Sequence, residues 1–206
     1  MQQFIITTIL IIFYNYLPIS AQDIYTDLNL QLFNQERLEI SQKSMLVLGS
    51  WSVVNMAAGG ILSTQTEGST KYFHQMNAGW NIINLAIAGA GYLGTRKALK
   101  ADDDWDLSAT VSEQHKMQKI LLFNAGVDLA YMMSGVYLIE RSKNNLDNQD
   151  RFKGFGQSLI LQGGFLFVFD LVQNQLHQRH GKQLDDFLGR VSISVSPVGI
   201  GCTFQL

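Results

Sequence analysis

The sequence predicts an all-α fold: a four-helix transmembrane bundle of two helical hairpins, with an N-terminal amphipathic helix and a short C-terminal β-hairpin. Four long runs of the 206-residue chain carry almost no charge, although charged residues make up 16% of the composition. Each run has about the 20 predominantly apolar residues that a membrane-spanning helix needs. Over residues 191–206 the hydrophobic period then changes from helical to alternating.

Residues 1–21 are predicted to be a secretory signal peptide. An apolar core from Phe4 to Tyr14 is followed by Pro18 and by Ala21, a small residue that suits the cleavage site. No basic residue precedes the core, so an uncleaved first membrane helix is the alternative.

Residues 22–43 are polar with spaced apolar side chains, among them Leu28, Leu32 and Leu38. This spacing predicts an amphipathic helix that lies against the bundle or along the membrane surface.

The bundle is predicted to occupy residues 44–183. Its four helices are expected at about 44–66, 72–97, 115–140 and 154–180. The first two charge-free runs lie inside these limits without interruption, and the last two contain only Asp128 and Asp170. A soluble bundle needs a charged outer face on every helix. The mean hydropathy of +0.06 is low for a membrane protein, but the missing charged faces favour the membrane.

Residues 184–206 are predicted to form the β-hairpin tail. Val191, Ile193 and Val195 alternate with serines, and a second alternating run follows Pro197. A two-stranded hairpin is marginal in water. We therefore expect it to pack on the bundle, on a second copy or on a partner's sheet.

The predicted location is the bacterial inner (cytoplasmic) membrane. A cleaved signal peptide puts residue 22 outside the cytoplasm, and four spans return the C-terminus to the same periplasmic side. The distribution of Lys and Arg between the connectors favours the opposite orientation.

The composition excludes several classes of protein. The formal net charge is −2 and no basic stripe is present, which argues against nucleic-acid binding. A single cysteine, Cys202, excludes an intramolecular disulfide and a Cys-rich zinc site. No nucleophile elbow or phosphate-binding glycine loop is recognisable, so we predict no catalytic residue and no cofactor.

Small and polar residues form one stripe on each predicted helix. The residues proposed for a ligand site or a proton path are His74, Asn77, Asn81, Asn84, Asn55, Asn124, Asp128, Asp170 and Gln173. Such stripes commonly serve helix packing. An ionisable residue inside a span, however, is by default a functional candidate.

Each intramembrane aspartate has a predicted partner. We expect His74 to lie near Asp128, and His177 near Asp170 on the same helix. His177 and His180 are also weak candidates for a metal site, because they lie three residues apart on one helical face.

Three stretches resemble a known group of proteins. The run MLVLGSWSVVNMAAGG, the turn Glu67-Gly68 and the run KYFHQMNAGWNIINLAIAG are similar to an uncharacterised family of small Gram-negative bacterial membrane proteins. The resemblance covers roughly residues 33–180. It implies a signal peptide, four membrane helices and a short tail, and it assigns no activity and no site residue.

Taken together, the sequence predicts an integral membrane protein of unknown function, a structural, accessory or interaction component rather than an enzyme. Its expected partners are the lipid bilayer and a second copy or another protein, contacted through the glycine-rich helix faces and the hairpin. A small proton- or cation-linked transporter or ligand-binding bundle is the first alternative. A membrane-embedded enzyme is the second.

Overall fold

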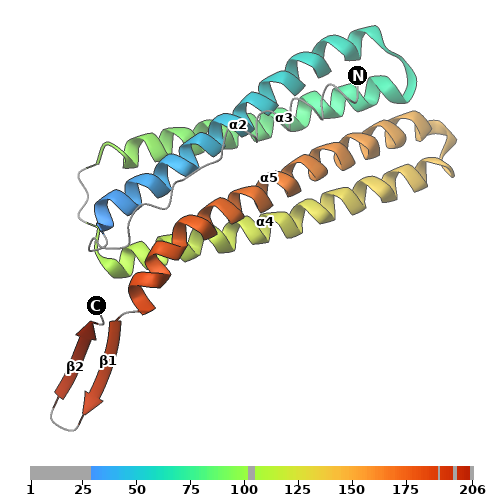
Figure 1. Ribbon diagram of the computed structural model, residues 1–206. Coiled ribbons are helices and arrows are strands. Elements are labelled where there is room, and N and C mark those ends of the chain that lie inside the picture. The colour runs from blue at the N-terminus through green and yellow to red at the C-terminus, as the bar shows by residue number, and fades with distance from the viewer. Residues whose placement is uncertain (1–28, 102–104, 190, 197–198, 205–206) are drawn as a thin grey trace.

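The computed structural model describes residues 29–101, 105–189, 191–196 and 199–204, with side chains up to Gly189. The predicted signal peptide, residues 1–21, lies outside this part of the chain. The long helices are α2 (Leu30–Gln65), α3 (Gly68–Ala98), α4 (Leu107–Ser142) and α5 (Gln149–Gly189), with a short 3₁₀ turn η1 (Leu146–Asn148) before α5. They form two antiparallel hairpins, α2–α3 and α4–α5, which lie side by side (Figure 1).

Local chemistry sets the ends of these helices. The side chain of Asn29 accepts a hydrogen bond from the backbone N–H of Leu32 at 3.0 Å, and Asp106 accepts one from Ala109 at 2.7 Å. Both are N-caps that satisfy otherwise free backbone donors. The α2–α3 turn needs Gly68, whose φ of +57° is a conformation that other residues rarely adopt.

The helices approach one another to backbone contact at glycines. A Cβ atom on Gly135 of α4 would lie 2.6 Å from the carbonyl oxygen of Gly156 on α5. A Cβ atom on Gly59 of α2 would lie 2.7 Å from the carbonyl oxygen of His74 on α3. Small residues at such crossings let membrane helices pack closely.

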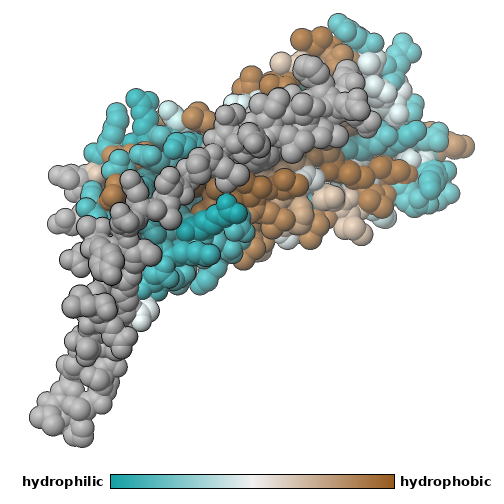
Figure 2. Space-filling model, viewed as in Figure 1, coloured by the Kyte–Doolittle hydropathy of each residue, from teal (hydrophilic) through white to brown (hydrophobic). Residues whose placement is uncertain are grey.

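Large apolar side chains cover much of the outer surface. Phe123 is 72% exposed, Met133 67% and Val54 65%. Figure 2 shows apolar residues along the middle of the helices and hydrophilic residues towards both ends. Such a surface suits lipid rather than water, where large exposed apolar patches are rare.

Within residues 29–101 and 105–189, three helices are long and apolar enough to cross a membrane: α2, α4 and the segment Leu146–Gly189 that contains α5. Helix α3 is not among them, although the sequence predicted four spans. Its asparagines and glycines dilute its hydropathy, and the buried asparagines face the other helices.

The predicted N-terminal amphipathic helix is wrong as a separate element. Helix α2 runs without a break from Leu30 to Gln65 and takes in the described part of that segment. The boundary between this helix and the first span was predicted at the last charged residue, Lys43, but no glycine or proline interrupts α2 at that point. For the same reason α4 and α5 extend beyond their predicted limits of 115–140 and 154–180.

The predicted fold class is also wrong in counting a C-terminal β-hairpin as part of the fold. The terminal backbone runs as β1 (Val191–Ser196) and β2 (Gly199–Phe204), which pair antiparallel. Both strands lie beyond the end of the bundle in Figure 1, and α5 takes up residues 184–189 of the predicted tail. An isolated two-stranded ladder is only marginally stable. The established fold is all-α and consists of the four helices.

Candidate functional site

A closed circuit of hydrogen bonds joins three helices in the middle of the bundle. The indole Nε1 of Trp51 (α2) donates to Oε1 of Gln162 (α5) at 3.0 Å, and Nε2 of Gln162 donates to Oδ1 of Asn77 (α3). Nδ2 of Asn77 donates to Oδ1 of Asn55 (α2) at 2.8 Å. Nδ2 of Asn55 closes the circuit on the backbone carbonyl of Trp51 at 2.8 Å.

The circuit links the two hairpins, because Gln162 belongs to one hairpin and the other members to the second. Asn55, Asn77 and Gln162 are buried, and Gln162 is fully so. The Trp51 ring also stacks on Phe165 of α5 with ring centroids 3.9 Å apart. Buried amides that satisfy each other avoid the penalty of an unpaired polar group.

Gln162 was not predicted as a site residue. It is a single amide in the run LILQGGFLFVF, and its isolation among apolar residues was the available signal. The sequence alone did not indicate that it would meet Asn77.

Asn81 and Asn84 continue the polar face of α3. Nδ2 of Asn81 donates to the backbone carbonyl of Asn77 at 2.8 Å, and Nδ2 of Asn84 donates to Oδ1 of Asn81 at 3.4 Å. Both residues are buried. The three asparagines therefore lie on one buried face, as their spacing indicated.

Two other candidates are less buried than these asparagines. Asn124 is exposed on the outside of α4, where the buried positions are Leu121, Ala125 and Asp128. His74 is half-buried, and its ring packs edge-on against Phe73 of its own helix.

Asp128 of α4 and Asp170 of α5 face each other. Both are buried, and their carboxyl groups lie within hydrogen-bonding contact. Within the described residues, neither carboxyl has a Lys, Arg or His nitrogen within 4 Å. The predicted partners, His74 for Asp128 and His177 for Asp170, are thus replaced by the other aspartate.

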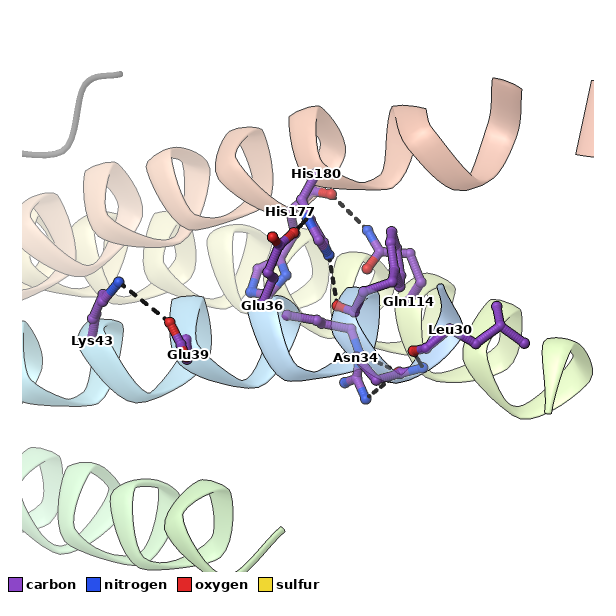
Figure 3. A network of polar contacts seen from close by, with 10 residues as sticks. Leu30, Asn34, Glu36, Glu39, Lys43, Gln114, His177 and His180 are labelled. Carbon is purple, nitrogen blue, oxygen red and sulfur yellow. Dashed lines mark hydrogen bonds and ion pairs between the residues drawn. The ribbon is translucent and has the colours of Figure 1, made fainter. Parts of the chain in front are cut away.

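A second polar cluster lies near the start of α2, where α2, α4 and α5 meet (Figure 3). Nε2 of His180 donates to the backbone carbonyl of Phe33 at 3.0 Å, and its ring stacks on the Phe33 ring at 4.1 Å. Nδ1 of His180 lies 3.6 Å from Oε2 of Glu36. Nε2 of Gln114 donates to the backbone carbonyl of His177 at 2.6 Å.

Arg37 is buried in the same region. Its Nε and Nη2 atoms donate to Oδ1 of Asn34 at 3.2 and 3.1 Å, and Nδ2 of Asn34 donates to Oγ1 of Thr110 at 2.7 Å. The guanidinium also lies 5.4 Å from the centroid of the Trp105 ring. These contacts tie α2 to α4, and none of them was predicted from the sequence.

The two remaining candidates on α5 contact serines of α2. Oγ of Ser44 donates to Oε1 of Gln173, and Nε2 of His177 lies 3.5 Å from Oγ of Ser41. His177 and His180 thus contact different groups. Within the described residues, no cluster of three His, Cys, Asp or Glu side chains could hold a metal ion.

The arrangement supports two kinds of chemistry. The amide circuit fixes how the helices pack, because every bond in it joins protein groups. The facing carboxyl groups are different, since two carboxylates offer only acceptors and attract a proton or a cation.

Comparison with known proteins gives a family but no activity. No curated protein and no solved structure matches the chain. A family model described as a family of unknown function matches residues 47–171, which include the amide circuit and both aspartates. This match confirms the expected membership of an uncharacterised family. The chain belongs to the family of unknown function DUF6992.

Proposed function

We propose that the protein is a structural or interaction component of a membrane. Its four helices form a rigid unit that presents an apolar outer surface to lipid and to neighbouring membrane proteins. The observation that supports this function best is the closed circuit of Trp51, Asn55, Asn77 and Gln162, because it joins the two hairpins.

The circuit favours a structural function over a transport path. A path or ligand site needs polar atoms that face a cavity, whereas these side chains donate to one another. A pocket of about 110 Å³ opens instead between Gln35 and Leu38 of α2, Leu99 at the end of α3, and Trp105. No member of the circuit lines this pocket.

The proposed location is the bacterial inner membrane with both termini in the periplasm, which requires α3 to cross the membrane together with the three more apolar helices. The apolar core of residues 1–21 supports this orientation, and the distribution of Lys and Arg opposes it. A reporter fused after Leu206 that is active only outside the cytoplasm, together with the mass of the mature N-terminus, tests it. An inactive reporter with Met1 retained would overturn the orientation.

The structural function is tested by two measurements on the full chain. Photo-crosslinking residues placed at Phe123 and at Ile83, which are exposed on α4 and α3, probe neighbours on two faces in native membranes. We expect a discrete protein adduct from one face and lipid adducts from the other. In sealed vesicles that contain the purified protein, we expect no proton or cation flux above protein-free vesicles.

Two results would contradict the proposal. One is lipid adducts alone from every exposed position tested on all four helices. The other is a flux that is lost in the Gln162→Leu variant while the helical content is retained.

A further inference from the structure

We propose that Asp128 and Asp170 form a proton-binding site in the core of the bundle, in which carboxyl groups from α4 and α5 hold one proton between them. The ligand is the proton itself. This inference goes beyond a structural role, because it gives the bundle a group that can take up and release a proton.

The geometry of the two side chains carries the proposal. Asp128 is 3% exposed and Asp170 7%, and their carboxyl groups lie within hydrogen-bonding contact across α4 and α5. A carboxylate has no hydrogen to donate. The contact becomes a hydrogen bond only if one carboxyl carries a proton that the other accepts.

An unsatisfied oxygen of Asp128 points in the same direction. Oδ2 of Asp128 is sealed from solvent and has no hydrogen-bond donor in the described residues. Buried polar atoms in folded proteins almost always have a partner. A proton held by the pair supplies the donor that the Asp128 carboxyl group lacks.

Among the residues that the structure describes, no Lys, Arg or His nitrogen lies within 4 Å of either carboxyl group. Phe165 and Phe169, on the same helix as Asp170, pack against Leu48 of α2 and Ala88 of α3, none of which titrates. The charged group that interacts with each aspartate is the other aspartate. Two negative charges this close in a low-dielectric interior repel strongly, and one shared proton removes the repulsion.

Close packing keeps the two carboxyl groups together. A Cβ atom on Gly163 of α5 would lie 2.9 Å from the backbone carbonyl oxygen of Asp128 on α4. The helices are therefore in backbone contact beside the pair and cannot separate freely there. If the shared proton were lost, the carboxylates could relieve their repulsion by turning their side chains apart, by moving α4 against α5 or by admitting water.

Infrared spectroscopy of the full-length protein in lipid nanodiscs tests the site. A protonated carboxyl group has a carbonyl band that is separate from the carboxylate bands and shifts in D₂O. At neutral pH we expect this band in the wild-type protein and its complete loss in the Asp128→Asn/Asp170→Asn double variant. Asparagine keeps the shape of aspartate, and circular dichroism checks that the double variant remains helical.

Asp186→Asn is the matched control, because Asp186 is an exposed aspartate on the same helix, α5. We expect this variant to keep the protonated-carboxyl band. Titration of the wild-type protein should show one proton per chain released from the pair as the pH rises, and the double variant should not release it.

Three results would overturn the proposal. The first is a folded wild-type protein without the protonated-carboxyl band at neutral pH. The second is persistence of the band in the double variant. The third is loss of the wild-type band when sodium or potassium ions are added at constant pH, which would identify the ligand as a cation instead.

Discussion

Replacing Gln162 by leucine should destabilise the bundle far more than the same change elsewhere on α5. The substitution removes the hydrogen bond from Trp51 and the hydrogen bond to Asn77. It leaves the indole N–H of the half-buried Trp51 and the amide oxygen of the buried Asn77 without a partner. Interhelical hydrogen bonds in membranes contribute about 0.6–2 kcal/mol each. Leaving a buried group unsatisfied costs about 1–3 kcal/mol.

The energy of a lost hydrogen bond and the cost of its unsatisfied partner must not be added, because both describe the loss of the same contact. The extra apolar contact of leucine offsets part of the loss. We therefore expect the free energy of unfolding to fall by about 2–4 kcal/mol. Reversible unfolding in mixed micelles, followed by circular dichroism, measures it.

The control is Gln157→Leu, because Gln157 is an exposed glutamine on the same helix. An exposed substitution should change stability by no more than about 0.5 kcal/mol. A double-mutant cycle of Gln162→Leu with Asn77→Leu should give a coupling energy of about 0.5–3 kcal/mol. If the two leucine variants were equally stable and the cycle showed no coupling, the circuit would not hold the hairpins together.

Two further predictions concern the packing and the environment of the helices. Gly135→Ala should destabilise the protein by about 1–3 kcal/mol, because its methyl group would meet the Gly156 carbonyl of the facing helix. Gly126→Ala is the control, because a Cβ atom at Gly126 has open space around it, and this variant should be neutral or stabilising. Equal midpoints of thermal unfolding for the two variants would contradict the close contact of α4 and α5 at Gly135. Phe123→Arg should reduce membrane insertion, since arginine at the centre of a span costs about 2.5–3.5 kcal/mol on insertion scales. Leu146→Arg, at the first residue of the segment Leu146–Gly189, should insert normally. Equal membrane fractions for the two arginine variants would contradict the proposal that α4 spans the membrane.

The helices were predictable from the sequence because their signal is local. A long stretch without charge, such as that between Lys43 and Glu67, indicates a helix whose outside is not in water. The ends of the helices were not predictable from charge. Asn29 and Asp106 start α2 and α4 by capping, and the helices continue through charged residues that lie beyond the apolar segments.

The side-chain pairs were predictable only in part. The spacing of Asn77, Asn81 and Asn84 placed them on one face, and this needs only the helical period. Which residue of another helix meets that face depends on the crossing, which glycine contacts set. Asn124 illustrates the limit: a small rotation of α4 puts Ala125 in the interior and leaves Asn124 exposed.

The difference between the amide circuit and the aspartate pair is a balance of donors and acceptors. An amide such as that of Gln162 supplies both, so amides can close a circuit without any ligand. Asp128 and Asp170 as carboxylates supply acceptors alone, and their contact lacks one hydrogen. The circuit therefore acts as part of the framework, whereas the pair is complete only with a proton. Substitutions in the pair should thus change the protonation of the protein, and substitutions in the circuit its stability.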